Sequence, residues 1–203
     1  MSRLSRALTE YLGRKVWASW RTALDLTAVE GCGGVVLLGD SLTHMGRWEL
    51  MFPQAGVRNF GIGGERSDHL LLRLEPVIRI RPQKLFLLIG TNDLASGLSV
   101  EAISRNVATL LDTLATRLPD CRLHLQAALP RQRKFAARIR ALNARYAAMA
   151  AQRGIAFIDL YPLFDDGTGE LKKELTYDRL HLMGAGYVIW RDALRPYVDG
   201  SPA

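Results

Sequence analysis

Cysteine is scarce in this sequence, with Cys32 and Cys121 as the two examples among 203 residues. They form no CxxC pair and have no histidine at the spacing of a zinc ligand, which argues against both a disulfide framework and a structural metal. Each precedes a different predicted strand, the first and the fourth, and this argues against a bridge between them. Two reduced thiols are typical of a cytoplasmic protein.

Long apolar runs are also missing. The longest, residues 35–38 and 85–89, have the length of strands, whereas a membrane-spanning helix needs about 20 apolar residues. Seven charged side chains interrupt residues 1–26, which leaves no apolar stretch of signal-peptide length. We therefore expect neither a membrane span nor secretion by that route.

Acidic residues are absent from one segment, and the net charge of +7 is concentrated there. Residues 121–158 hold +8 and the rest of the chain −1. The basic residues are Arg122, Arg131, Arg133, Lys134, Arg138, Arg140, Arg145 and Arg153. Most fall on one predicted helix, outside its apolar stripe from Phe135 to Met149, which favours a solvated helix face over a nucleic-acid partner. A module that binds nucleic acid or an anionic surface through this helix stays open as an alternative.

Hydrophobic residues make up 48% of the chain and charged residues 23%, which indicates a single globular domain spanning residues 1–203. Short, nearly continuous apolar runs predict buried strands at residues 34–38, 57–60, 84–89, 122–127 and 155–158. Amphipathic segments predict helices at residues 41–51, 67–80, 100–117, 132–153 and 184–197, with a helical segment at residues 1–30 packing on the domain. This alternation predicts an α/β fold, a three-layer α/β/α sandwich around a flavodoxin-like five-stranded parallel sheet.

Small polar clusters follow four of the predicted strands. Ligands bind outside the carboxyl ends of the strands in such sheets, so these clusters predict a site at that rim. The clusters are Gly39-Asp40-Ser41, Gly61-Ile62-Gly63-Gly64-Glu65, Gly90-Thr91-Asn92-Asp93 and, in the long loop after the fifth strand, Asp178-Arg179-Leu180-His181.

Ser41 is the candidate nucleophile because it lies at a strand-to-helix turn, although a serine there is more often an ordinary helix cap. A serine hydroxyl needs a neighbouring base to take its proton and a third group to orient that base. Asp178 and His181 have the three-residue spacing that places two side chains on one face of a helical turn. The remaining histidines fall in predicted helices or in a predicted strand. They are His44, His69 and His124.

Acyl transfer also requires donors for the oxyanion that forms in the transition state. The backbone N–H groups of Ser41 and Gly64 and the side-chain amide of Asn92 all follow neighbouring predicted strands. Each has an ordinary explanation by itself, a loop for the glycine and a turn cap for the asparagine. Their joint placement favours an oxyanion hole.

At these residues the chain resembles the SGNH hydrolases, also called the GDSL lipase/esterase superfamily. The matching blocks occur in the order found in the family and are Gly39-Asp40-Ser41-Leu42, Gly64, Gly90-Thr91-Asn92-Asp93 and Asp178-Arg179-Leu180-His181-Leu182. The resemblance implies a catalytic triad of Ser41, His181 and Asp178, with an oxyanion hole formed by Ser41, Gly64 and Asn92. It extends over residues 35–196.

Residues 59–64 and 70–74 look especially like the catalytic subunits of intracellular platelet-activating factor acetylhydrolase and their bacterial relatives. Two positions depart from the family pattern. Glu65 stands where the second block usually has aspartate, and Arg179 occupies a position that is often glycine in bacterial relatives. Neither belongs to the triad or to the oxyanion hole that the resemblance implies.

Other catalytic motifs are absent from the sequence, including GxSxG, the P-loop GK[ST] and HExxH. We therefore expect a serine esterase that hydrolyses small-molecule, short-chain acyl esters, above all acetyl esters, without a metal or organic cofactor. Residues 131–134 follow a short loop after the fourth predicted strand, and this loop has no inserted lid, which predicts an open site for short acyl groups. A thioesterase or lysophospholipase at the same site, and assembly as a homodimer, stay open.

Overall fold

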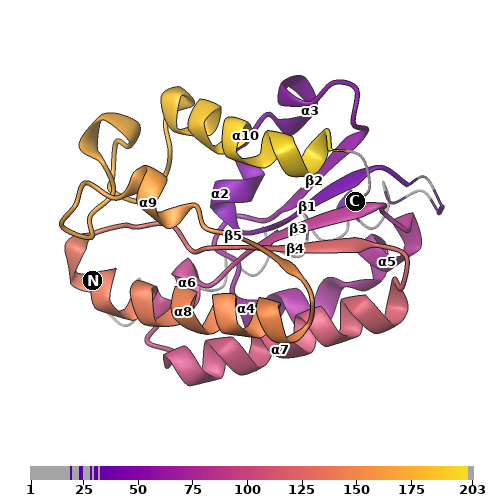
Figure 1. Ribbon diagram of the computed structural model, residues 1–203, viewed down its shortest axis with the longest axis horizontal. Coiled ribbons are helices and arrows are strands. Elements are labelled where there is room, and N and C mark those ends of the chain that lie inside the picture. The colour runs from indigo at the N-terminus through magenta and orange to yellow at the C-terminus, as the bar shows by residue number, and fades with distance from the viewer. Residues whose placement is uncertain (1–18, 20–22, 25–27, 29, 32, 201–203) are drawn as a thin grey trace.

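The computed structural model describes residues 33–200 together with Ser19, Ala23, Leu24, Ala28, Glu30 and Gly31. A five-stranded sheet forms its centre (Figure 1). The strands are β1 (Val35–Gly39), β2 (Val57–Gly61), β3 (Lys84–Leu88), β4 (Arg122–Gln126) and β5 (Ala156–Ile158). Neighbouring strands are parallel and follow the order β2-β1-β3-β4-β5. This order confirms the predicted flavodoxin-like sheet.

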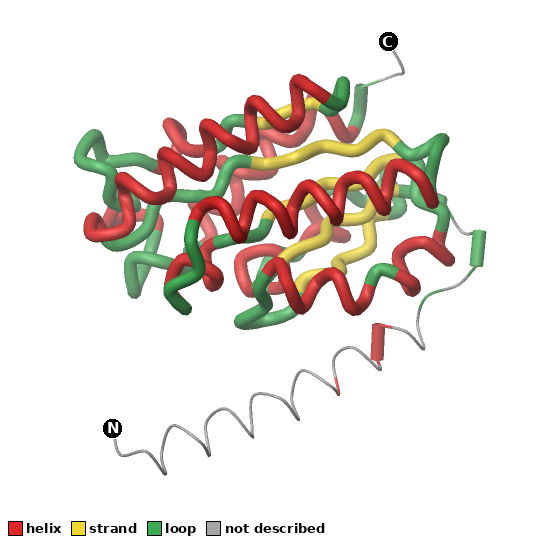
Figure 2. The backbone as a smooth tube through the Cα atoms, turned by 90° about the horizontal axis from the view of Figure 1, so that it is seen from below, coloured by secondary structure: helices red, strands yellow, loops and turns green. Residues whose placement is uncertain are grey.

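Helices cover both faces of the sheet, which confirms the predicted α/β/α sandwich. One face carries α2 (Ser41–His44), α3 (Trp48–Met51) and α10 (Gly184–Val198), and the other carries α4 (Ser67–Leu70), α5 (Glu75–Ile80), α7 (Val100–Arg117) and α8 (Ala136–Gln152) (Figure 1). The long helices α7 and α8 pack side by side (Figure 2). Shorter elements are η1 (Leu71–Arg73), α6 (Thr91–Ala95), η2 (Arg133–Phe135), α9 (Tyr161–Phe164) and η3 (Lys173–Leu175).

Alternate residues of β1 and β3 enter two different hydrophobic cores, because successive side chains point to opposite faces of the sheet. Val36 and Leu38 of β1 belong to the core under α7 and α8. Val35 belongs to the core under α10, where Trp48 and Trp190 meet edge to face with ring centroids 4.9 Å apart. Both faces of β1 are buried, and this explains the continuous apolar run that predicted the strand.

Three predicted helices are divided in the structure, and one of them, residues 132–153, is divided only near its start, into η2 and α8. The segment 41–51 forms α2 and α3. The indole N–H of Trp48 donates to the Thr43 carbonyl at 2.7 Å, and in a continuous helix this carbonyl would accept a backbone N–H four residues later. The segment 67–80 forms α4, η1 and α5. Pro76 lies in the first turn of α5 and has no N–H to continue a helix from the preceding residues.

Most of the predicted helical segment at residues 1–30 lies outside the described residues, as does Cys32. Leu24 and Ala28, which are described, pack with the core on the α7 and α8 face. Cys121 is a free thiol, and burial raises its pKa to about 12. No helix in the described part of the chain is both long enough and apolar enough to span a membrane.

The basic segment makes internal contacts that its sequence pattern did not predict. Arg145 forms an ion pair with Glu101, and Arg153 forms one with Asp112, so both join α8 to acidic residues of α7. Arg131 departs further from the expected solvated face, because it is only 7% exposed. Part of the positive charge is therefore used within the fold.

Candidate active site

Ser41 occupies the first position of α2, just beyond the carboxyl end of β1. Asp40 caps this helix, since its Oδ1 atom accepts the backbone N–H of Leu42 at 3.0 Å. The preceding residue, Gly39, is packed so closely against β3 that a Cβ would lie 2.3 Å from the Leu88 carbonyl oxygen. The tight turn after β1 therefore requires glycine, and it holds the serine at the rim of the sheet.

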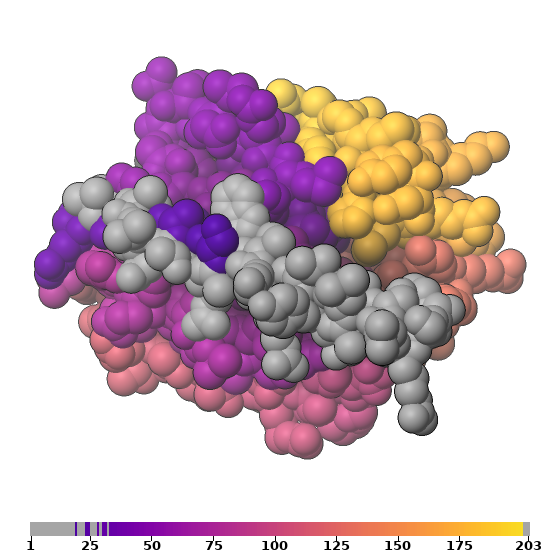
Figure 3. Space-filling view, turned by 180° about the vertical axis from the view of Figure 1, so that it is seen from behind, coloured from indigo at the N-terminus to yellow at the C-terminus, as the bar shows by residue number. Residues whose placement is uncertain are grey.

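His181 contacts Ser41 although the two residues are 140 positions apart in the sequence. The Ser41 hydroxyl donates to Nε2 of His181 at 3.0 Å when the ring proton is on Nδ1. The Tyr187 hydroxyl of α10 donates to the Leu42 carbonyl at 2.8 Å and so ties the C-terminal helix to α2. Figure 3 shows the violet surface of the early elements beside the yellow surface of the C-terminal segment.

Asp178 holds His181 through both of its carboxylate oxygens. Oδ2 accepts the Nδ1–H of His181 at 2.7 Å, and Oδ1 accepts the backbone N–H groups of His181 and Leu180 at 2.7 and 3.0 Å. Burial acts to raise the pKa of Asp178, but these hydrogen bonds outweigh it and hold the pKa below its ordinary value. The carboxylate is therefore ionised and fixes the imidazole tautomer that presents Nε2 to Ser41.

The other three histidines have partners elsewhere. Nδ1 of His44 lies 2.9 Å from the Gly61 carbonyl oxygen. His69 lies on α4 beside Asp68. His124 stacks on Phe86 within the sheet, and burial lowers its pKa. His44, His69 and His124 were the other candidates for the base, and the contacts described here involve none of them with Ser41.

The predicted oxyanion donors follow the three neighbouring strands β1, β2 and β3. Gly64 has a φ of 74°, a left-handed conformation that favours glycine. Asn92 is the second residue of α6, and its Nδ2 donates to the Glu65 carbonyl at 2.9 Å. The amide of Asn92 thus lies against the glycine-rich loop after β2. The catalytic roles of Ser41, Gly64 and Asn92 stay predictions.

A buried ion pair that sequence reasoning missed supports the same loop. Arg73 and Glu65 are 4% and 1% exposed, and Nε of Arg73 donates to both carboxylate oxygens at 2.7 and 2.8 Å. The guanidinium also donates to the Phe60 carbonyl at 2.8 Å and to the Gly39 carbonyl at 3.3 Å. Arg73 therefore joins the ends of β1 and β2. The available signal was an arginine inside the apolar run at residues 70–74.

A second missed network lies behind α6. Asp93 is fully buried and accepts the backbone N–H and the hydroxyl of Ser67, at 3.0 and 2.5 Å. Asn106 of α7 donates to the Ser67 hydroxyl oxygen at 2.9 Å. Burial raises the pKa of Asp93. These contacts fix α6, which carries Asn92, against α4 and α7.

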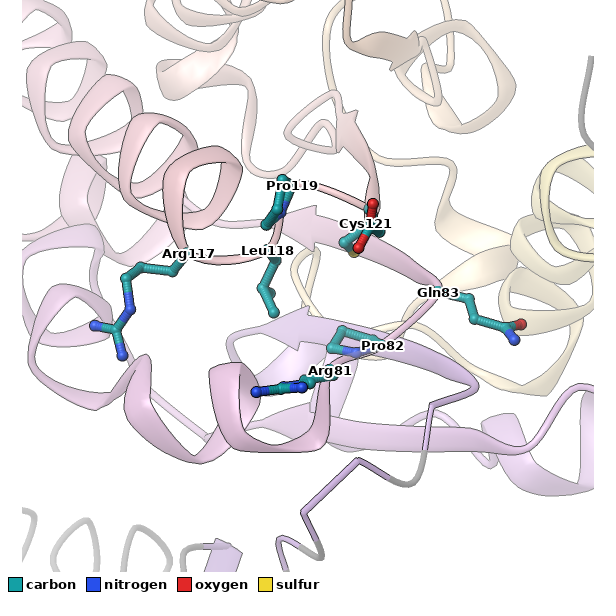
Figure 4. Close-up of a pocket in the computed structure, with 8 residues that line it drawn as sticks. Arg81, Pro82, Gln83, Arg117, Leu118, Pro119 and Cys121 are labelled. Atoms are coloured by element: carbon teal, nitrogen blue, oxygen red, sulfur yellow. The ribbon is translucent and has the colours of Figure 1, made fainter.

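The opposite edge of the sheet contains a hollow of about 380 Å³ that has no part in this arrangement (Figure 4). It is lined by residues that precede β3 and β4, including Arg81, Pro82, Leu118 and Cys121. Within the described residues, no group of three or more histidine, cysteine or acidic side chains is arranged to hold a metal ion. The cluster of polar side chains around Ser41 is therefore the candidate site.

Comparisons with known proteins show the family to which the chain belongs. The model of the GDSL-like lipase/acylhydrolase family matches residues 37–189. The Bos taurus platelet-activating factor acetylhydrolase IB subunit alpha1 is 31% identical over 164 residues, which cover 75% of this chain and 69% of that protein.

Solved structures share the fold across most of the chain. A Streptococcus pneumonia protein described as a platelet activating factor has a TM-score of 0.86 at 25% identity and covers 98% of this chain and 100% of its own. A GDSL-like lipase from Bacteroides thetaiotaomicron has a TM-score of 0.72 at 27% identity, covering 81% and 87% respectively. The chain belongs to the GDSL-like lipase/acylhydrolase family and is a carboxylic ester hydrolase.

Proposed function

We propose that this protein is a serine esterase that hydrolyses short-chain acyl esters, above all acetyl esters, through Ser41, His181 and Asp178. The observation that carries the proposal is the unbroken series of hydrogen bonds from the Ser41 hydroxyl through the His181 ring to Asp178. Such a series supplies a nucleophile, a base and a group that orients the base.

In the first half of the reaction, Ser41 Oγ attacks the acyl carbonyl carbon while its proton passes to Nε2 of His181. The N–H groups of Ser41 and Gly64 and the amide of Asn92 donate to the oxyanion of the tetrahedral intermediate. His181 then gives the proton to the alcohol oxygen, the ester C–O bond breaks, and an acyl-enzyme remains on Ser41.

In the second half, His181 takes a proton from water and the hydroxide attacks the acyl-enzyme carbonyl. The second tetrahedral intermediate collapses, the proton returns to Ser41 Oγ, and the carboxylic acid leaves. Asp178 stays ionised throughout, because its hydrogen bonds hold its pKa below the ordinary value. Its charge stabilises the imidazolium that forms in each half.

The preference for short acyl groups rests on the shape of the rim. The chain passes from β4 to η2 through residues 127–132 with no inserted lid. Tyr177, which stacks on His181 with ring centroids 6.0 Å apart, is 65% exposed. Such an open rim offers little apolar surface to bury a long acyl chain. The acetylhydrolase names of the curated relatives support the same choice.

The candidate substrates for this site differ in the alcohol or thiol to which the acyl group is attached. An acetyl xylan esterase shares the fold with a TM-score of 0.69 at 22% identity, which supports including acetylated sugars in the test. Thioesters and lysophospholipids are the other two classes. Turnover of acetylated xylose oligomers, acetyl-CoA and a lysophospholipid, measured beside p-nitrophenyl acetate, butyrate and octanoate, assigns the class.

Ser41→Ala tests the nucleophile. We expect kcat to fall by about 10⁴-fold to 10⁶-fold with the fold retained, by analogy with other triads. A fluorophosphonate probe should label the parent protein and not the variant. Ser99 serves as the control because it is a helix-capping serine whose side chain accepts from Ala102 N–H. Ser99→Ala should keep both turnover and labelling. Undiminished turnover or labelling in Ser41→Ala contradicts the proposal.

A further inference from the structure

Arg131 is a buried cation that the proposed reaction does not yet use. It follows β4, is 7% exposed, and its guanidinium lies 4.2 Å from the centre of the Phe135 ring. Among the described residues, no carboxylate comes within ion-pair distance of it. Burying a charge without an ion pair is costly, so such a residue is retained only where its contacts compensate.

The hydrogen bonds of Arg131 lead to two parts of the proposed site. Nη1 donates to the carbonyl and hydroxyl oxygens of Thr91, at 3.0 and 3.3 Å, and Thr91 immediately precedes Asn92. Nε donates to Oε1 of Gln132 at 2.8 Å, and Nε2 of Gln132 donates to the Asp178 carbonyl at 3.3 Å. One guanidinium therefore connects the turn that carries the amide donor with the loop that carries the carboxylate.

The backbone of Arg131 contacts the same long loop. Its carbonyl accepts the N–H of Leu171 at 3.3 Å, and Arg131 pairs with Glu170 as a parallel β-bridge. The positive charge of Arg131 also favours its position near Asp178. Burial lowers the pKa of Arg131, while the negative charges of Asp178 and Asp40 raise it. The attraction to Asp178 favours the ionised carboxylate that orients His181.

We propose that Arg131 is a positioning residue for ester hydrolysis, which holds Asn92 through Thr91 and Asp178 through Gln132 and through its charge. The inference rests on the proposed function. It assigns Arg131 no contact with the substrate. Its effect is to keep the oxyanion donor and the triad carboxylate in one fixed geometry, because misplacing catalytic groups by about 1 Å costs about 100-fold in rate.

The test compares two variants of Arg131 with a variant of Arg138, a nearby arginine of α8. Arg131→Met removes the positive charge and the hydrogen bonds. Arg131→Lys keeps the positive charge but loses the guanidinium that donates to Thr91 and to Gln132 at the same time. Arg138→Met is the control. Arg138 also donates to backbone carbonyls, those of Leu94 and Leu98, but at the far end of α6 from Asn92. Each is measured for p-nitrophenyl acetate kinetics and melting temperature, with parent and Ser41→Ala as references.

We expect kcat to fall about 30-fold in Arg131→Met and about fivefold in Arg131→Lys, with KM changing by less than about threefold. Arg138→Met should lower the melting temperature and leave kcat near the parental value. In an Asp178→Asn background, Arg131→Met should cost less in kcat than it does in the parent, because the attraction between the two charges is gone while the contact of Arg131 with Thr91 remains.

A kcat within about twofold of the parent in folded Arg131→Met overturns the proposal. So does an equal loss of kcat in Arg138→Met, or an undiminished loss in the Asp178→Asn background. If Arg131→Met does not fold, the lysine variant decides, and a kcat within about twofold of the parent overturns the proposal. If the parent itself shows no Ser41-dependent hydrolysis, the proposed function fails first and the role of Arg131 fails with it.

Discussion

Asp40, the residue that caps α2 beside Ser41, should make the protein less stable as pH rises. Its side chain is fully buried. Oδ1 accepts the Leu42 N–H, but Oδ2 has no hydrogen-bond partner among the described residues. Burial raises the pKa of Asp40 from 3.8 to about 7. The folded protein therefore keeps this proton at pH values where the unfolded chain has released it.

The sign and size of the effect follow from this difference. Between pH 3.8 and 7 the unfolded state ionises Asp40 and the folded state does not, so the free energy of unfolding falls as pH rises through this window. Above pH 7 the full penalty of about 4 kcal/mol is present. Asp40→Asn removes the charge and keeps an acceptor for the Leu42 N–H. The variant should match the parent near pH 4 and exceed its stability by about 2–4 kcal/mol at pH 8.

Urea unfolding followed by far-ultraviolet circular dichroism at pH 4, 6 and 8 measures this difference. The m-value should stay constant, so that a change in midpoint reports stability. Asp192→Asn is the matched control, because Asp192 is exposed and Arg191 and Arg195 lower its pKa. That control should give no gain at pH 8. A stability difference between Asp40→Asn and the parent that is the same at pH 4 and pH 8 would refute the reasoning.

Three further results are expected. Asn92→Ala should lower kcat by about 10²-fold to 10³-fold with a smaller change in KM, because the oxyanion exists only in the transition state; a variant that melts early but turns over normally removes Asn92 from the mechanism. His181→Ala should abolish p-nitrophenyl acetate turnover while His44→Ala keeps it, and the reverse pattern would make His44 the base. Arg73→Met removes the guanidinium from the buried carboxylate of Glu65 and should cost about 3–5 kcal/mol in thermal or urea unfolding; a cost below about 1 kcal/mol would show that the pair is not needed.

The sheet and its rim could be predicted because their signals are local. A strand buried on both faces must be apolar along its length, as at residues 35–38, and a parallel sheet brings the carboxyl ends of its strands to one edge. The polar clusters at Ser41, Gly64 and Asn92 were therefore predicted to lie close together before any contact was known. The pairing of Asp178 with His181 was predicted from a helical turn, and that reason was wrong, because residues 178–181 form bends and Arg179 has a left-handed φ of 62°.

The helix boundaries were less predictable, since they depend on packing partners. Where residues 41–51 divide into α2 and α3, the Trp48 indole donates to the Thr43 carbonyl, and nothing in the periodicity of the segment predicts that hydrogen bond. The buried state of Arg131 was missed for a similar reason. A basic residue in a basic segment predicts exposure, and only the tertiary neighbours Thr91 and Phe135 make burial favourable.

The sequence by itself therefore determined the order of the elements, the burial of the strands and the residue types at the rim, because each depends on neighbours within a few positions. The tertiary structure decided which of these residues meet. The contact between Ser41 and His181 spans 140 positions, and that between Arg73 and the Phe60 carbonyl joins a helix to a strand end. Such contacts are set by strand order and helix placement, which arise only when the whole chain has packed its two cores.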